Sequence, residues 1–242
     1  MVNERPQGWL RSPDILAKKP IIGWIMFIVG ILVFALLAIN LVANGPLIAV
    51  DTSITNSLHD TALSISKGLL NFIKLGWTFG NEGVMILGGL MGVYFIIRRY
   101  WKELWMVAVG NIGGPLLFLA ISHIFNRHRP EFAVPVAATL TGPGFPSGHA
   151  VIAVTLYGLL AYLLIPTISS CFWKWVVIIL AVLMMLFIGF SRLFTGGHYL
   201  TDIIAGYAVG LAWAGVSYMT IETYFTRRAK KKRMQRLGVT ND

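Results

Sequence analysis

Long blocks of apolar residues are the feature that most restricts how this chain can fold. The 242 residues are 56% hydrophobic and only 12% charged, and the apolar residues form uninterrupted stretches rather than amphipathic stripes. Several stretches reach the ~20 residues that a helix needs to cross the hydrocarbon core of a bilayer. Ordinary soluble domains carry about 25% charged residues and could not bury so much apolar surface at this length. The sequence therefore predicts an integral membrane protein.

The apolar blocks predict an all-α integral membrane fold, a bundle of six transmembrane helices. They lack the alternation of a membrane β-barrel, so helices are the structure that satisfies the backbone in lipid. The predicted spans cover residues 21–43, 83–97, 104–124, 150–165, 173–190 and 200–221, the second extendable towards Trp77. The first block lacks a small-residue cleavage site, so we expect a retained span rather than a signal peptide. One domain, residues 21–222, is thus flanked by a basic N-terminus (1–20) and a basic tail (223–242).

The segment between the first two spans, residues 44–80, differs from the other connections. Apolar side chains such as Ile54, Leu58 and Phe72 recur at helical spacing among polar ones. This pattern is typical of a helix that lies in the membrane interface, here on the outer side. Such a helix either flanks a lateral entrance for a lipid or merely caps the bundle, and the sequence leaves both interpretations open.

The distribution of positive charge predicts the orientation in the membrane. With the N-terminus inside, 15 of the 20 Lys and Arg residues fall in cytoplasmic segments, which the positive-inside rule favours. We therefore expect a multi-pass cell-membrane protein with both termini in the cytoplasm. The formal charge of +10 sits mostly at the ends of apolar blocks, a pattern typical of topology signals and anionic lipid headgroups. The lipid bilayer is the expected partner, nucleic acid is not, and no pattern indicates an oligomeric state.

Three polar segments fall on the outer side of the predicted bundle. They are residues 126–130 after the third span, 145–149 at the start of the fourth, and 191–202 between the fifth and sixth. Ionisable residues at membrane depth are costly and are candidates for function by default. Under the six-span topology the three segments come to the same face, which predicts one site built from all of them.

The arginines and one helix start in these segments predict a phosphate-binding site. Arg127, Arg129 and Arg192 supply planar, permanently charged groups that suit phosphate oxygens. Ser147 and Gly148 precede a predicted helix, whose N-terminal N–H groups favour an anion, and glycine lets the backbone approach it closely. We therefore expect these five residues to hold a phosphate group.

Two histidines and a carboxylate predict phosphoryl transfer. His198 and Asp202 are four residues apart, which places them on one face if the sixth helix begins near His198. A carboxylate that holds one ring nitrogen leaves the other free to attack phosphorus. His149 lies on another predicted helix and can donate a proton to the leaving oxygen. The arginines already supply the positive charge that a metal would bring, and the single cysteine forms no metal cluster, so no metal or other cofactor is expected.

Together the three segments resemble the signature of the type 2 phosphatidic acid phosphatase superfamily. That signature reads Lys, six residues, Arg-Pro; then Pro-Ser-Gly-His; then Ser-Arg, five residues, His, three residues, Asp. The second motif is complete at residues 146–149 and the third at 191–202. The resemblance implies a metal-independent phosphohistidine mechanism with His198 as nucleophile, Asp202 as its partner and His149 as general acid. It also implies a lipid phosphate as the substrate.

The first motif departs from the family pattern at Ser122. This serine stands seven residues before Arg129, where the family has lysine. One charged phosphate contact is then missing, a loss of roughly 1.5–3 kcal/mol if nothing compensates for it. Arg127, two residues before Arg129, is the expected substitute, ahead of His123 and His128.

Three functions are compatible with these residues. The first is hydrolysis of a lipid phosphate or diphosphate on the outer face, with undecaprenyl diphosphate favoured over phosphatidylglycerol phosphate and phosphatidic acid. The second is a lipid phosphotransferase, in which another acceptor replaces water on the same phosphohistidine. The third is a non-catalytic lipid-binding or transport protein, against which the retention of both His149 and His198 argues. The vanadate-binding haloperoxidases of the superfamily are soluble, which six spans make a remote alternative.

Overall fold

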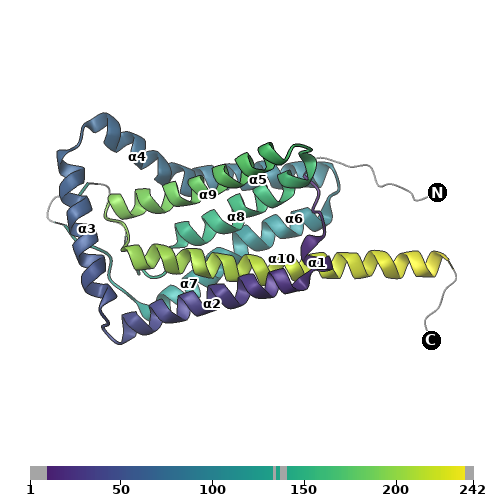
Figure 1. Cartoon of the computed structure of the whole chain (residues 1–242), viewed down its shortest axis with the longest axis horizontal. Coiled ribbons are helices and arrows are strands. Elements are labelled where there is room, and N and C mark those ends of the chain that lie inside the picture. The colour runs from purple at the N-terminus through teal and green to yellow at the C-terminus, as the bar shows by residue number, and fades with distance from the viewer. Residues whose placement is uncertain (1–9, 133–134, 137–140, 238–242) are drawn as a thin grey trace.

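Helices make up every regular element of the part of the chain that the structure describes. The structure is a computed structural model that describes residues 10–132, 135–136 and 141–237. Its elements are α1 (Ile15–Lys18), α2 (Pro20–Val42), α3 (Leu47–Ser64), α4 (Lys67–Gly80), α5 (Glu82–Ile97), α6 (Trp101–Ala108), a π-helical turn η1 (Val109–Gly113), α7 (Gly114–Phe125), α8 (Gly148–Leu164), a 3-10 turn η2 (Ile165–Thr167), α9 (Cys171–Phe194) and α10 (Leu200–Arg236). Figure 1 shows the long helices side by side, α3 lying across one end of the bundle, and α10 projecting past the other.

Six helical segments of the described chain are long and apolar enough to cross a membrane. They are Pro20–Val42, Lys67–Ile97, Trp101–Phe125, Gly148–Thr167, Cys171–Phe194 and Leu200–Arg236. This confirms the predicted all-α, six-span fold class. Residues 1–9 of the predicted basic N-terminus and 238–242 of the predicted tail lie outside the described residues. The rest of the tail is a helix, because α10 continues to Arg236.

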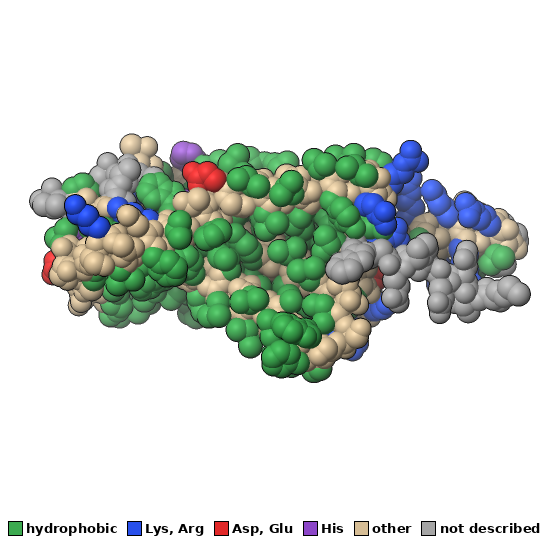
Figure 2. Space-filling view, turned by 90° about the horizontal axis from the view of Figure 1, so that it is seen from above, with side chains coloured by type: hydrophobic (Ala, Val, Ile, Leu, Met, Phe, Trp, Pro, Cys, Tyr) green, Lys and Arg blue, Asp and Glu red, His purple; other side chains and the backbone are tan. Residues whose placement is uncertain are grey.

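Apolar side chains cover the outside of the bundle as well as its interior. On α2, for example, Ile25, Leu32 and Leu36 are all more than half exposed. Figure 2 shows hydrophobic side chains over the middle of the molecule, with Lys and Arg side chains gathered towards the end from which α10 projects. An apolar belt of this extent suits contact with lipid tails, since soluble monomers rarely expose such large patches.

Small residues bring the first and last spans into backbone contact. A Cβ atom on Gly23 would lie 2.9 Å from the Gly215 carbonyl oxygen, and one on Gly215 would lie 2.7 Å from the Gly23 carbonyl oxygen. Gly30 faces Ala208 and Ala212 in the same way. Small residues permit this approach where lipid supplies no hydrophobic force between helices. The contacts hold α10 against α2, so the N-terminal end of α10 is firmly placed.

The structure divides the predicted interfacial segment, residues 44–80, into two parts. Helix α3 is not among the candidate spans, whereas α4 continues into α5 and belongs to the second span. The candidate span that contains the predicted second span, Lys67–Ile97, is therefore longer than predicted, whereas α3 lies in the predicted segment between the first two spans without being a candidate span itself. At Gly76, a Cβ atom would lie 2.8 Å from the Phe187 carbonyl oxygen. This glycine lets α4 pack closely on α9, a contact that the spacing of apolar residues alone does not reveal.

Candidate active site

The three polar segments meet at the end of the bundle where α3 lies. The loop after α7 carries Arg129, the start of α8 carries His149, and the turn between α9 and α10 carries His198. The rings of His149 and His198 are 6.3 Å apart, centroid to centroid. The Ser147 N–H donates to the Asp202 carbonyl oxygen at 2.9 Å, which ties the start of α8 to the start of α10. The predicted site residues thus form one group.

His198 is held in a single tautomer by its neighbours. Its side chain is 1% exposed, its Nδ1 lies 2.8 Å from the Gly144 carbonyl oxygen, and its Nε2 lies 2.9 Å from Arg129 Nη1. Because a carbonyl oxygen only accepts hydrogen bonds, Nδ1 is assigned the proton, and Nε2 turns its lone pair towards the arginine. Nε2 is therefore the atom of His198 that can act as a nucleophile.

The surroundings of His198 keep the ring uncharged. Burial lowers the pKa of His198 well below its usual value, and the positive charges of Arg129 and Arg192 lower it further. The hydrogen bond to Gly144 opposes this shift but does not cancel it. Both burial and like charge penalise the imidazolium form, so Nε2 keeps its lone pair at neutral pH, where that lone pair faces Arg129 Nη1.

Asp202 lies behind His198 without a short hydrogen bond to it. Its Oδ2 is 3.7 Å from His198 Nδ1, which is beyond hydrogen-bonding range. Oδ2 accepts instead from the Tyr199 N–H at 2.8 Å, and Oδ1 accepts from Arg127 Nη1 at 2.6 Å. The tautomer that Asp202 was expected to fix is held by Gly144, because a free N–H group at the start of α10 competes for the carboxylate. Asp202 is therefore close to the ring but is not hydrogen-bonded to it.

Arg192 and Ser147 place unpartnered donors in the site. The Arg192 side chain is 1% exposed, and its guanidinium stacks on the Trp77 ring at 4.6 Å. Among the described residues, Nε and Nη2 of Arg192 and the hydroxyl of Ser147 have no hydrogen-bond partner. Buried donors without partners are rare and costly in folded proteins. Such donors suit the oxygens of a phosphate group.

Arg129 joins two loops beside the nucleophile. Its Nε donates to the Gly142 carbonyl oxygen at 3.1 Å, its Nη2 to that of Pro143 at 3.0 Å, and its Nη1 to that of Gly197 at 2.7 Å. Burial lowers the pKa of Arg129, against the opposing charge of Asp202, but a guanidinium stays charged at any pH relevant here. The same Nη1 faces His198, so Arg129 is within reach of a phosphate that binds there.

A cavity of about 630 Å³ lies next to these residues, and neither His149 nor His198 is among the residues that line it. It is lined by Arg129, Arg192, Gly197 and the loop residues that follow α7. A Cβ atom on Gly197 would collide with the Arg192 guanidinium, so glycine is required there. Cavities of this size commonly hold small ligands, and this one accommodates a phosphorylated headgroup.

Arg127 lines the same cavity as Arg129 and Arg192, but its guanidinium is engaged by two carboxylates. Its Nη1 donates to Asp202 Oδ1 and, at 2.8 Å, to Thr201 Oγ1, while its Nη2 donates to Asp51 Oδ2 at 2.8 Å. Burial alone would lower the pKa of Arg127, but the charges of Asp202 and Asp51 outweigh it and the pKa is raised. That Arg127 replaces the missing lysine stays a prediction, and this geometry favours a positioning role. Ser122, where the family has lysine, is buried and donates to the Leu119 carbonyl oxygen at 2.9 Å.

Sequence reasoning missed Asp51, which belongs to none of the motifs. Its side chain is 2% exposed; it accepts from the Thr201 N–H at 3.0 Å and also from the Thr201 hydroxyl. A signal was present, because Asp51, Thr55 and His59 are spaced by four and all lie on the buried face of α3. A buried polar stripe on a helix beside a reaction centre indicates contact with that centre. Gly144 was also missed, since it contributes only a backbone oxygen.

The described residues contain no group of three or more His, Cys, Asp or Glu side chains that could hold a metal ion. Metal independence stays a prediction that an activity assay tests.

Comparisons with known proteins agree on one family. Residues 99–225, which contain all three polar segments, match the model of the PAP2 superfamily. The chain is 30% identical over 168 residues to phosphatidylglycerophosphatase B of Bacillus subtilis, covering 66% of this chain and 79% of that protein. It is 25% identical over 214 residues to an undecaprenyl-diphosphatase of Sulfolobus acidocaldarius, covering 86% and 94%. The fold is similar to the crystal structure of a transmembrane PAP2 type phosphatidylglycerolphosphate phosphatase from Bacillus subtilis, with a TM-score of 0.62, 24% identity, and 84% and 96% coverage.

Proposed function

This chain belongs to the PAP2 superfamily and is a membrane lipid phosphate hydrolase, and from that premise we propose that it works through a phosphohistidine on His198. The observation that carries the proposal is the lone pair of a neutral His198 Nε2 beside Arg129. The unpartnered donors of Arg192 and Ser147 support it, because they provide for the phosphate oxygens that a nucleophile at this place would attack.

In this proposal, Arg129 leaves His198 Nε2 and contacts a phosphate oxygen when the substrate binds. The phosphate accepts from Arg192 Nε and Nη2 and from the Ser147 hydroxyl. Arg129 Nη1, 2.9 Å from His198 Nε2 in the resting site, turns to a phosphate oxygen and releases the lone pair. Gly148, at the start of α8, presents backbone N–H to the same anion.

The first chemical step forms the bond between Nε2 and phosphorus and breaks the bond to the lipid oxygen. His149 donates its proton to that leaving oxygen. The ring of His198 gains positive charge, which the Asp202 carboxylate at 3.7 Å stabilises while Nδ1–H still donates to Gly144. In the second step a water attacks phosphorus, His149 takes its proton, and the phosphorus–nitrogen bond breaks. Inorganic phosphate leaves and both histidines return to their starting protonation.

The substrate in this proposal is a lipid phosphate or diphosphate. The names of the two relatives support phosphatidylglycerol phosphate and undecaprenyl diphosphate, and we place undecaprenyl diphosphate first because the predicted site faces outwards. Phosphate release from polyprenyl and glycerolipid phosphates in nanodiscs tests this choice. If phosphate instead appears on an added acceptor, the reaction is a phosphotransfer. If His198→Ala protein keeps full activity while His123→Ala protein behaves as a matched control, the phosphohistidine is refuted.

Both termini are proposed to lie in the cytoplasm and the active site outside. The basic end of α10 supports this, because it lies at the opposite end of the bundle from the histidines. Cys171, the single cysteine, is exposed at the start of α9, away from the active site. A membrane-impermeant maleimide should therefore label Cys171 only after cells are permeabilised. An Asn126→Cys, Cys171→Ser variant should be labelled in intact cells, and the reverse pattern contradicts the orientation.

A further inference from the structure

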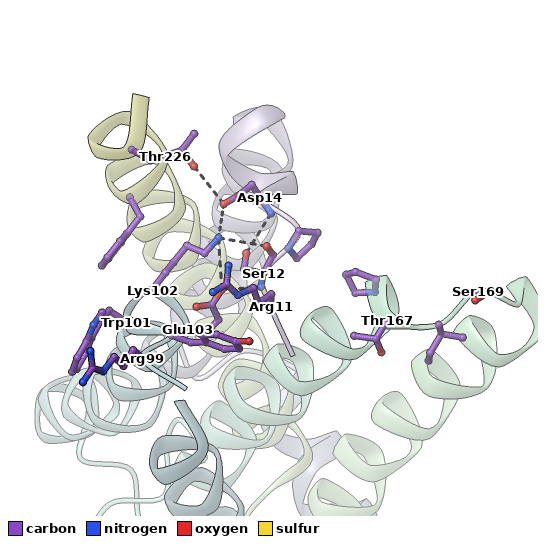
Figure 3. Close-up of a pocket in the computed structure, with 16 residues that line it drawn as sticks. Arg11, Ser12, Asp14, Arg99, Trp101, Lys102, Glu103, Thr167, Ser169 and Thr226 are labelled. Atoms are coloured by element: carbon purple, nitrogen blue, oxygen red, sulfur yellow. Dashed lines mark hydrogen bonds and ion pairs between the residues drawn. The ribbon is translucent and has the colours of Figure 1, made fainter. Parts of the chain in front are cut away.

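A second cavity lies at the end of the bundle opposite the histidines. Its volume is about 690 Å³, larger than that of the cavity at the active site. It forms where the segment before α1, the turn between α5 and α6, the turn between α8 and α9, and the C-terminal half of α10 meet (Figure 3). None of its lining residues belongs to the motifs or to the reaction proposed above, so it needs an explanation of its own.

This cavity lies at the level where the spans end. Helix α5 ends at Ile97 and α8 at Leu164, directly before the two turns that line it. Trp101, Trp173 and Trp175, at the same end of the bundle, are 52%, 57% and 60% exposed. Exposed tryptophans gather where a membrane meets water, at the depth of the lipid headgroups. The cavity is therefore at headgroup depth rather than within the hydrocarbon.

The side chains that line the cavity carry a net charge of +1, from Arg11, Arg99 and Lys102 against Asp14 and Glu103. Lys102 is compensated within the protein, since its Nζ lies 2.6 Å from Asp14 Oδ1 and 3.8 Å from Glu103 Oε1. Arg11 and Arg99 form no ion pair with any described residue. Arg11 stacks on the Tyr100 ring at 4.2 Å, and its buried Nε has no hydrogen-bond partner among those residues. Figure 3 shows Arg11 inside the group of lining side chains, next to Ser12 and Glu103, and Arg99 beside Trp101.

We propose that this second cavity binds the phosphate group of an anionic membrane phospholipid. Planar guanidinium groups suit phosphate oxygens, and the buried Nε of Arg11 gains the acceptor it lacks. Basic pockets between membrane helices at the cytoplasmic side are suited to lipid headgroups, and the basic stretch of α10 adds to the attraction. Headgroup depth and Trp101 at the rim favour a lipid over free phosphate, because acyl chains can continue along the apolar outer surface. The inference does not depend on the phosphohistidine.

The test counts anionic lipids on the purified full chain by native mass spectrometry. Delipidated protein is titrated with phosphatidylglycerol, with phosphatidylcholine, or with inorganic phosphate. We expect the wild type to bind two phosphatidylglycerol molecules tightly, one at each end of the helix bundle. Arg99→Gln and Arg11→Gln should each weaken one of them about tenfold or more, the usual size of a lost charge-assisted contact. Arg129→Gln should weaken the other one, at the active site.

The controls separate this site from general charge and from the active site. Lys19, exposed at the same end but outside the cavity, provides a matched control, and Lys19→Gln should keep both lipids. Arg99 is exposed, so Arg99→Gln should melt like the wild type and release phosphate at the wild-type rate in detergent. Unchanged lipid binding in Arg99→Gln and Arg11→Gln would overturn the proposal. So would equal binding of phosphatidylcholine, or equal occupancy by inorganic phosphate alone.

Discussion

Asp51→Asn tests whether α3 contributes to catalysis through Arg127. The substitution keeps the shape of the side chain and one oxygen that can accept from the Thr201 N–H, now 3.0 Å away. The amide N–H groups cannot accept from Arg127 Nη2, which lies 2.8 Å from Asp51 Oδ2 in the structure. Arg127 then keeps one carboxylate, Asp202, and is free to pull it out of line with His198.

The expected loss of kcat follows from the contact between Asp51 and Arg127. A hydrogen bond to a charged group contributes about 1.5–3 kcal/mol, and each 1.4 kcal/mol of barrier is about tenfold in rate. If the whole loss reaches the transition state, kcat falls by about 10- to 150-fold. KM should change less than kcat, because Asp51 does not itself line the cavity beside the site and acts on it only through Arg127. Asp51 is thus a positioning residue, and the division between kcat and KM is the signature of that role.

The assay is phosphate release in nanodiscs at saturating and limiting substrate, with melting temperature as the check on folding. Asp60, exposed on the same helix, provides the matched control, and Asp60→Asn should behave like the wild type. A double-mutant cycle adds the decisive measurement: if Asp51 acts through Arg127, Asp51→Asn should cost little more in an Arg127→Gln background. A folded Asp51→Asn protein with wild-type kcat, or a full additional loss in the double variant, refutes the reasoning.

Three further predictions concern the two histidines and the independence of the reaction from metal ions. His198→Ala should abolish phosphate release and His149→Ala should reduce it by about 10²- to 10⁴-fold, the usual contribution of a general acid; full activity in either variant contradicts the assigned role. Because the pKa of His198 is well below 6.5 in the fold, the unfolded chain binds an extra proton below about pH 6.5, so stability is full above that pH and declines as pH falls further. His198→Gln should therefore show a smaller drop in melting temperature between about pH 7.5 and about pH 5.5 than the wild type, and an equal drop tells against this linkage. Phosphate release should persist in excess chelator, and strict dependence on added Mg²⁺ contradicts a metal-independent site.

The spans were predictable because apolar blocks of sufficient length have few alternatives in a membrane. The continuation of α10 to Arg236 was not, because the apolar signal stops near Ile221 while Ala, Lys and Arg, all good helix formers, carry the helix on. The packing of α4 on α9 depends on how closely Gly76 lets the two helices approach, and such a contact between two helices cannot be read from one of them alone.

For the site, the sequence predicts which residues belong to it but not which contacts their side chains make. His149, His198 and Arg192 were predictable because their chemistry is unusual at membrane depth and their spacing is that of a known signature. The ion pairs of Arg127 were not predictable, because the sequence shows a cation but not the carboxylates that it contacts in the fold. Asp51 lies on a helix without a motif, and its partner Thr201 is distant along the chain, so their contact exists only in the folded bundle.

The close contact between α2 and α10 sets the order in which this protein can be completed during synthesis. Gly30 and its neighbour Ala208 are separated by roughly 180 residues, which at about 5–20 residues per second take roughly 10–40 s to translate. For that time the first span is in the membrane with its glycine face covered only by lipid. The helix that finally covers it also carries Asp202, so the inserted chain gains the carboxylate beside His198 and the contact between its first and last spans in the same late event.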